Sequence, residues 1–304
     1  MPELPEVETI SSGLARRIVG RTVTEVVGDQ SRLFRHNPDG WETVSRALLH
    51  REIGAVGRRG KFFWLALAPQ DQVGDGTRCL VIHLGMSGQV HAQLAGYSVP
   101  WGHKHEHLWV GLDNDASLSF VDQRQFGHLT VSRLEPAGPA LIPGAIRHIA
   151  PDPLEAAFDL VAVTERARRS NRTVKSLLLD QGLVSGIGNI YADETLFRSR
   201  WPGWTRGREL SVDDWAQVFA HARQILTEAI AAGGTSFDEL YVNVEGDPGY
   251  FSRSLAVYGR EGKPCPGCGQ PIERIVLEKR SHFYCPSFCG EAPPAKVPES
   301  GNFQ

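Results

Sequence analysis

Four of the five cysteines stand close together near the end of the chain, and they constrain its folding more than any other feature. They form two pairs, Cys265-Pro-Gly-Cys268 and Cys285-Pro-Ser-Phe-Cys289, about one β-hairpin apart. Two such pairs supply the four thiolates that a tetrahedral Zn²⁺ site requires. Disulfides are not expected in the cytosol, so the pairs predict one structural zinc ion. The alternative, four unligated thiols, would leave a short segment with little core to fold around.

Length and composition bound the remaining possibilities. The chain has 304 residues, of which 41% are hydrophobic, enough for two domains or for one domain with a small appendix. No run is apolar enough to span a membrane, and the acidic N-terminus lacks a signal-peptide pattern, so we expect a cytoplasmic protein. The net charge of −3, from 32 basic and 35 acidic residues, gives no compositional support for nucleic-acid binding, which would have to rest on local patches.

The first eight residues, Met-Pro-Glu-Leu-Pro-Glu-Val-Glu, can begin a helix and can also carry chemistry. Removal of an initiator Met before a small residue leaves Pro2 with a free secondary amine, which is a nucleophile once it is neutral. Apolar residues recur at helical spacing from residue 7 to residue 18, so the amine lies near a helix N-terminus, whose partial positive charge disfavours an ammonium. Glu3 beside it is a candidate acid/base. The alternative is a frayed, acidic helix start without chemistry.

Further along the chain, the pattern changes from strands to helices. Alternating segments at 22–27, 62–67, 79–84 and 117–121 predict strands, and helical periods occur at 174–181, 191–200 and 215–232. The last of these helices has Ser211 as its expected N-cap, with Asp214 three residues on. We therefore expect an N-terminal domain at 1–131, a Pro- and Gly-rich linker at 132–153, a helical domain at 154–250, a cysteine-bearing hairpin at 251–290 and a disordered tail at 291–304.

Four more motifs present side chains on turns. The segment Gln181-Gly-Leu-Val-Ser-Gly-Ile-Gly-Asn189 joins two predicted helices, and the amides that open the second helix suit a phosphate. His83-Leu-Gly-Met86 and Asp122-Gln-Arg-Gln-Phe-Gly127 offer apolar or planar side chains at loop tips, which can wedge into a base stack. Arg280 lies at the basic tip between the cysteine pairs. Taken singly, each motif could be a plain helical hairpin, a packed turn or an exposed basic turn.

Together with the first eight residues and the cysteine pairs, these motifs resemble the formamidopyrimidine-DNA glycosylases of bacterial base-excision repair, in the expected order over about residues 2–290. The resemblance implies an α+β multidomain fold: an N-terminal β-sandwich with an N-terminal helix, a helix–two-turn–helix domain and a C-terminal zinc-finger hairpin. It implies a glycosylase/AP lyase that excises oxidised purines, such as 8-oxoguanine and formamidopyrimidines, through a Schiff base on the N-terminal proline and cleaves the strand by β,δ-elimination. The expected partner is double-stranded DNA with oxidised purines or abasic sites, bound by a nucleoid-associated monomer that contacts no membrane.

The resemblance also implies residue roles by position. Glu3 would protonate the opening ribose, Lys61 would contact phosphate and assist proton transfer, and Arg280 would enter the damaged-nucleotide site. The expected catalytic residues are Pro2, Glu3, Lys61 and Arg280. The expected DNA contacts are Met86, His105, Arg124, Phe126, Lys175 and Asn189. The expected zinc ligands are Cys265, Cys268, Cys285 and Cys289.

The chain departs from the family pattern at two points, and two other functions stay open. Its second cysteine pair has three intervening residues where the family usually has two, and its Asp122 loop lacks a proline and a second arginine. One open function is an endonuclease VIII-like specificity for oxidised pyrimidines, which the long loop after Thr235 opposes. The other is a non-catalytic DNA-binding relative, which the intact Pro2, Glu3 and Lys61 oppose.

Overall fold

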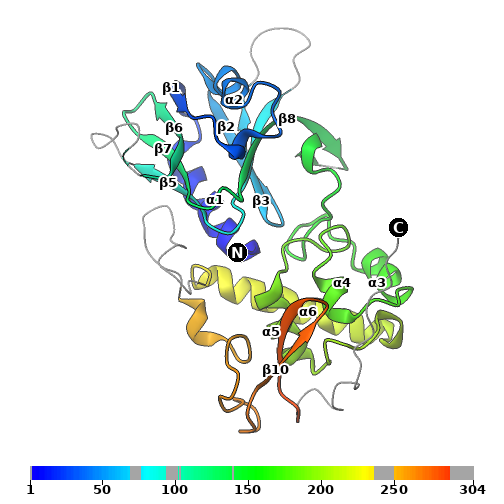
Figure 1. The fold of residues 1–304 in the computed structure, drawn as a ribbon. Helices are drawn as coiled ribbons and strands as arrows, with labels where there is room; N and C mark the ends of the chain where they lie inside the picture. The colour runs from blue at the N-terminus through cyan, green and yellow to red at the C-terminus, as the bar shows by residue number, and fades with distance from the viewer. Residues whose placement is uncertain are drawn as a thin grey trace. The chain divides into compact units, whose positions relative to one another are not determined.

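The computed structural model describes residues 2–68, 77–93, 102, 104–138, 140–235 and 250–287. The chain folds into two compact units, which are considered separately below (Figure 1). Unit 1 contains residues 1–148 and 232–252, and unit 2 contains residues 149–231 and 253–304. The expected helical domain at 154–250 therefore differs from the observed division, because the chain returns to unit 1 after residue 231.

Unit 1 is a β-sandwich of two antiparallel sheets. One sheet has the order β1 (Val23–Gly28), β6 (Glu106–Leu112), β7 (Ser117–Asp122), β5 (Gly88–Gln93). The other has the order β2 (Ile53–Arg59), β3 (Phe62–Leu67), β4 (Arg78–His83), β8 (His128–Ala137), β9 (Ala140–Pro143). The helices are α1 (Leu4–Ile18) and α2 (Trp41–Leu48), with short 3-10 turns at Arg32–Phe34 and Gly144–Ile146. A further 3-10 turn, Phe251–Ser254, begins in unit 1 and ends in unit 2.

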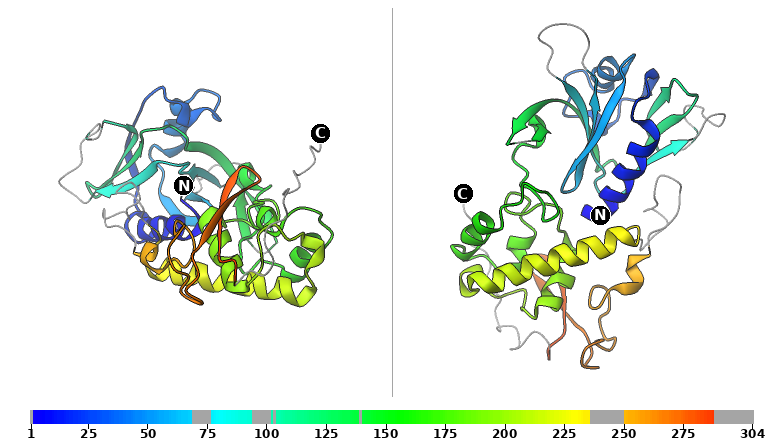
Figure 2. Two further views of the ribbon diagram at one scale, coloured as in Figure 1. Left: turned by 60° about the horizontal axis from the view of Figure 1, so that its bottom comes forward. Right: turned by 180° about the vertical axis from the view of Figure 1, so that it is seen from behind.

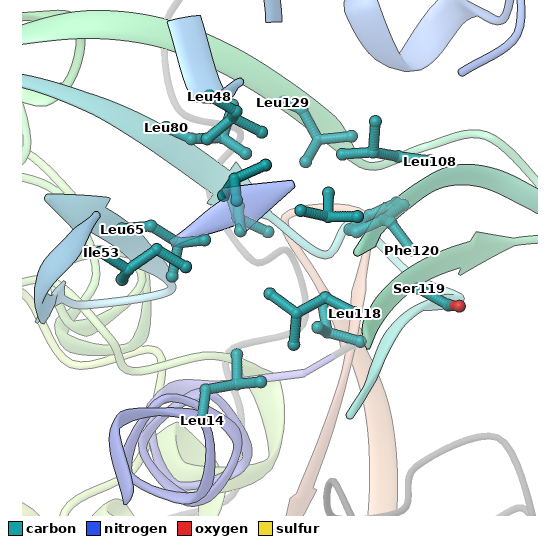
Figure 3. A pocket seen from close by; sticks show the side chains of 14 residues that line it. Leu14, Leu48, Ile53, Leu65, Leu80, Leu108, Leu118, Ser119, Phe120 and Leu129 are labelled. Atoms are coloured by element: carbon teal, nitrogen blue, oxygen red, sulfur yellow. The ribbon is translucent and has the colours of Figure 1, made fainter. Parts of the chain in front are cut away.

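The core of unit 1 lies between the two sheets and is closed by α1. Helix α1 contacts β2 and β3 of one sheet and β5 of the other (Figure 2). Its apolar stripe, Val7, Ile10, Leu14 and Ile18, is buried as the helical spacing predicts. Leu14 and side chains from both sheets line a small cavity in which Ser119 is the one polar lining residue (Figure 3).

Strands occupy part of the expected linker at 132–153. Most of β8 and all of β9 fall within it, and Glu135 pairs with Ile142 in that hairpin. Pro136 and Pro143 had suggested irregular chain for the whole segment. Proline is tolerated in an edge strand, and Pro143 ends β9, which is at the edge of its sheet.

Unit 2 combines four α-helices with one hairpin among its described residues. The helices are α3 (Leu160–Arg168), α4 (Val174–Leu178), α5 (Asn189–Ser199) and α6 (Val212–Ala231), with a 3-10 turn at Gly207–Glu209. The hairpin consists of β10 (Glu273–Leu277) and β11 (Arg280–Tyr284), and β11 lies against α5. The predicted cap of the long helix is present, because the Asp214 amide donates to Ser211 Oγ at 3.1 Å and the Ser211 amide to Asp214 Oδ2 at 2.9 Å.

Within the described ranges, none of the helices has both the length and the apolar character needed to cross a bilayer.

Candidate functional site

The N-terminal residues are fixed at the start of α1. Pro2 and Glu3 are both buried, and Glu3 is the residue that precedes the helix. The Glu3 amide donates to Glu6 Oε2 at 2.8 Å, one half of a capping box. Pro5 stands in the first turn, where a missing N–H costs nothing. The chain therefore holds the Pro2 nitrogen close to the N-terminal end of a helix, which carries partial positive charge.

Glu6 joins the helix start to the segment that follows α6 in the chain. Its Oε1 accepts from the Thr235 amide at 2.7 Å and from Thr235 Oγ1 at 2.8 Å. Gly234 has φ +85°, and a Cβ there would lie 3.0 Å from Glu6 Oε1, so the close approach favours glycine. The loop expected to cover an everted base begins here, but residues 236–249 lie outside the described part of the chain.

Lys61 lies on the turn between β2 and β3 and is only 7% exposed. The neighbouring Arg58 donates from Nε to Glu8 Oε2 on α1 at 2.5 Å, and from Nη1 to the Gly60 carbonyl at 3.3 Å. Lys61 belongs to this turn, and the bonds of Arg58 attach the turn to α1, the helix that begins beside Glu3.

Met86, Arg124 and Phe126 come together on the surface of unit 1. The Arg124 guanidinium lies 4.9 Å from the centre of the Phe126 ring, and Arg124 Nη2 lies 3.6 Å from Met86 Sδ. Phe126 is 49% exposed and Met86 is 39% exposed, so apolar surface is offered to solvent at the loop tips. Gly85 (φ +64°) makes the arrangement feasible, because a Cβ there would lie 2.4 Å from the Gly127 nitrogen.

Asp122 organises the loop that carries Arg124 and Phe126. It is fully buried, and its carboxylate accepts from Ser87 Oγ at 2.6 Å, the Arg124 amide at 3.2 Å and the Gly127 amide at 2.8 Å. The half-buried His105 is tied to the same loop, since its carbonyl accepts from the Asp122 amide at 3.0 Å. The sequence indicated these residues one by one, and the structure brings them together.

Sequence reasoning missed a group of imidazoles next to Lys61. His83 and His128 are register partners on β4 and β8, and their rings stack with centroids 5.1 Å apart. Burial, with the nearby charges of Lys61 and Arg35, lowers the pKa of His83 to about 4. Burial, with His83 and Arg35, likewise lowers the pKa of His128 to about 3. No local signal could have found this pair, because it depends on the register of two strands far apart in the chain.

In unit 2, the expected phosphate-contacting residues meet at one backbone oxygen. Lys175 Nζ donates to the Ser281 carbonyl at 2.6 Å, and Asn189 Nδ2 donates to the same oxygen at 3.0 Å. Lys175 is buried and also forms an ion pair with Asp193 at 2.7 Å, which its charge pattern did not predict. Arg280, next to Ser281, is exposed. A polar pocket is lined by Arg172, Thr173, Lys175, Ser176, Leu179, Leu277, Glu278 and Arg280.

The cysteine cluster fits a zinc ion. The sulfurs of Cys265, Cys268 and Cys285 lie within 4.8 Å of one another, while Cys289 lies outside the described residues. The Gln270 backbone amide, with the Cys285 side chain, lowers the pKa of the Cys268 thiol, which favours the thiolate that binds metal. Amides turned toward sulfur, such as that of Gly267 at 3.4 Å from Cys265 Sγ, are typical of a tight metal-binding turn.

Three family models match successive parts of the chain. They are the formamidopyrimidine-DNA glycosylase N-terminal domain at residues 1–129, the H2TH domain of the same family at residues 149–239, and a zinc finger found in FPG and IleRS at residues 262–287. The zinc-finger match and the convergent sulfurs agree on one structural zinc ion.

Curated relatives and solved structures match over nearly the whole length. A Nocardioides protein named formamidopyrimidine-DNA glycosylase is 45% identical over 96% of this chain and 95% of its own, and one from Rhodococcus jostii is 43% identical over 99% of both. The crystal structure of the MutM (Fpg) protein of Thermus thermophilus is 36% identical, with a TM-score of 0.78, over 96% of this chain and 100% of that one. A Lactococcus lactis Fpg complex with abasic-site DNA is 27% identical, with a TM-score of 0.79, over 95% and 100%.

Proposed function

Because the chain belongs to the formamidopyrimidine-DNA glycosylase family, we propose that it is a DNA glycosylase/AP lyase that removes oxidised purines from duplex DNA in base-excision repair. The observation that supports this most is the fixed start of α1. Glu3 and Pro2 are buried at a helix N-terminus, and the Glu6 carboxylate ties this end to Thr235. A frayed helix start would need none of these bonds.

The reaction begins with the amine of Pro2. An ordinary N-terminal amine has a pKa of about 7.7–8.0, so roughly a tenth to a fifth is neutral at pH 7, and the helix end increases that fraction. With the damaged nucleotide flipped out of the duplex, the nitrogen attacks C1′ of the sugar while Glu3 protonates the opening ribose, and the base leaves. The product is a Schiff base between Pro2 and C1′.

Strand cleavage follows from the Schiff base. The iminium acidifies the C2′ protons, and loss of one of them expels the phosphate on the 3′ side of the sugar. A second elimination expels the phosphate on the 5′ side. We propose that Lys61 and Arg280 bind phosphate next to the lesion, where Lys61 also assists proton transfer and the guanidinium supplies two parallel donors.

The remaining surface residues hold the opened duplex. Met86, Arg124 and Phe126 would fill the gap left by the flipped nucleotide, as their shared exposed position supports. We propose that His105 and Asn189 contact the DNA backbone. Lys175 matches a phosphate-contacting position of the family, but here it is buried and paired with Asp193. Gln125 stands where the family has a second arginine; its φ is 51°, and its Oε1 accepts from the Arg32 amide at 3.3 Å. We propose that Arg124 and Phe126, on either side of it, keep the gap-filling role.

The zinc ion stabilises the hairpin and takes no part in the chemistry. Cys265, Cys268 and Cys285 fit it, and we propose Cys289 as the fourth ligand. Four thiolates leave no open position for water or substrate. We also propose that the enzyme is a monomer that works in the cytoplasm on the nucleoid, where its substrate lies.

A strand-cleavage assay tests the function. With a duplex that contains 8-oxoguanine opposite cytosine, the protein should release the base and leave a one-nucleotide gap with phosphate at both ends. A duplex with an oxidised pyrimidine, cut under the same conditions, should be processed far more slowly. Faster excision of the pyrimidine would favour the endonuclease VIII-like specificity, and binding without cleavage of either duplex would favour a non-catalytic relative.

A further inference from the structure

Asp193, in the middle of α5, binds three groups from other segments. Its side chain is fully buried, and Oδ1 lies 2.7 Å from Lys175 Nζ and 2.6 Å from His282 Nδ1. Oδ2 accepts from the Phe283 amide at 3.0 Å. A buried carboxylate is tolerated when it is paired and hydrogen-bonded in this way, and here every partner belongs to α4 or β11. The group of Asp193, Lys175 and His282 is called the Asp193 network below.

The Asp193 network has a defined charge state. His282 Nε2 lies 3.2 Å from the Gly203 amide, which can only donate, so Nε2 accepts and the ring proton lies on Nδ1, facing Asp193. The imidazole is therefore neutral in this arrangement. Asp193 and Lys175 form an ion pair, so the charge of this lysine is balanced within the protein.

All three residues that follow Arg280 are held by these contacts. The Ser281 carbonyl accepts from Lys175 and Asn189, His282 bonds to Asp193 and Gly203, and the Phe283 amide bonds to Asp193. Arg280 itself is exposed at the start of β11.

The two residues before Arg280 are held in place as well. The hairpin tip has Glu278 at φ 49° and Lys279 at φ 66°, left-handed conformations that cost a non-glycine residue about 1 kcal/mol or more each. Glu278 Oε1 accepts from Thr173 Oγ1 at 3.1 Å, which fixes this tip to the start of α4. The residues before and after Arg280 are both anchored, so the backbone of Arg280 is fixed. The direction in which its side chain leaves the strand is therefore fixed as well.

We infer that Asp193 is a positioning residue that acts through Arg280: the Asp193 network holds β11 so that the guanidinium meets the DNA phosphate in the geometry that excision requires. The inference rests on the proposed function, in which Arg280 contacts the damaged nucleotide. It also assigns Lys175 a role through the hairpin, in place of the direct phosphate contact that the family resemblance implied.

A general role in folding the zinc-bearing segment is the competing explanation, and the chain contains a matched control for it. Glu194, the next residue on α5, is also a buried carboxylate, and it accepts from the amides of Ala256, Val257 and Tyr258 at 2.9 Å each. It anchors the entry to the cysteine-bearing segment, whereas Asp193 anchors the strand beside Arg280. Glu194→Gln therefore weakens the same segment at a different point.

The test is a double-mutant cycle with Arg280→Ala, using the full chain with its zinc. Asp193→Asn is the direct variant. His282→Phe is the second, because it keeps a ring beside Trp204 and Tyr284 but loses both hydrogen bonds and leaves the Lys175–Asp193 pair intact. Zinc content, the duplex Kd and the single-turnover excision rate are measured for each variant. Misplacement of a positioned group by about 1 Å can lower a rate by up to about a hundredfold.

We expect both variants to keep one zinc per chain and a Kd within about threefold of the parent, while excision slows by about tenfold or more. In the Arg280→Ala background the same changes should slow excision by less than about twofold, since the group that they position is gone. Glu194→Gln should have the same small effect in both backgrounds.

Two outcomes would overturn the inference, and they are distinguishable. If Arg280→Ala excises slowly but Asp193→Asn and His282→Phe slow it further by the same factor as in the parent, the positioning role of Asp193 is wrong and the proposed function stands. If Arg280→Ala excises as fast as the parent, the assignment of Arg280 in the proposed function is wrong, and the inference falls with it.

Discussion

The paired imidazoles of His83 and His128 predict that unit 1 loses stability in mild acid. Each ring uses Nδ1 as an acceptor: the Gly85 amide lies 3.2 Å from His83, and Arg35 Nη2 lies 3.4 Å from His128. Protonation would place a donor against a donor, next to Arg35 and Lys61. The folded protein therefore keeps both rings neutral well below the ordinary pKa of 6.5, to about 4 for His83 and about 3 for His128.

The direction of the effect follows from proton binding. Below pH 6.5 the unfolded chain protonates these rings while the folded chain does not, so the unfolded state binds more protons and stability falls as the pH falls toward about 4. Between about pH 7 and about pH 5, the shift of His83 alone amounts to a loss of about 2 kcal/mol. His128 adds less than its shift suggests, because it is only partly buried and solvent screens it. A loss of this size is a large fraction of the stability of a typical domain, about 5–15 kcal/mol.

Urea unfolding followed by tryptophan fluorescence measures this loss. The parent protein should lose at least about 2 kcal/mol between about pH 7 and about pH 5, and His83→Gln should lose about 2 kcal/mol less over the same interval. His50→Asn is the control, because His50 is an exposed histidine with φ 61°, a conformation that asparagine tolerates, and it should keep the parent's pH dependence. Equal pH dependence in the parent and His83→Gln would refute the reasoning.

Three further predictions concern the zinc site, a loop contact and the charge of Lys175. Cys268→Ser should release zinc and unfold the hairpin, since metal binding supplies most of the hairpin's folding free energy. Metal analysis and duplex binding measure this, and a folded, active protein without zinc would contradict it. Gly85→Ala should destabilise unit 1 by about 2 kcal/mol or more in urea unfolding, because the residue has φ +64° and its Cβ would lie 2.4 Å from the Gly127 nitrogen. An unchanged unfolding midpoint would show that the turns carrying Gly85 and Gly127 can move apart at no cost. In the Arg280→Ala background, the double variant Lys175→Met, Asp193→Asn should leave the slope of log Kd against log salt concentration unchanged, whereas a fall of about 0.9 in its magnitude would restore Lys175 as a direct phosphate contact.

Local patterns in the sequence predicted the elements whose folding is decided locally. The spacing of Val7, Ile10, Leu14 and Ile18 identified the buried stripe of α1, and Ser211 with Asp214 identified the start of α6. The cysteine spacing predicted the metal site, because thiolate ligands must be presented by two short turns.

Contacts between distant residues escaped sequence reasoning. The expected linker at 132–153 contains all of β9, because Pro143 was judged without the sheet edge that accommodates it. Lys175 was expected to contact phosphate because the family resemblance implies it, and nothing in the neighbouring sequence shows that Asp193 and the Ser281 carbonyl will enclose its side chain. The stacking of His83 on His128 depends on a register that forms only when β4 and β8 pair.

The central claim is that the nitrogen of Pro2 is the nucleophile, and borohydride trapping tests it most directly. Lesion-bearing duplex, protein and borohydride should give a covalent adduct that peptide mass analysis maps to Pro2. Pro2→Gly, which keeps a primary amine, should trap weakly. An extra residue before Pro2 should abolish both excision and cleavage while the duplex Kd stays nearly the same. An adduct that maps to Lys61 or to any other lysine, with Pro2 unmodified, would contradict the claim.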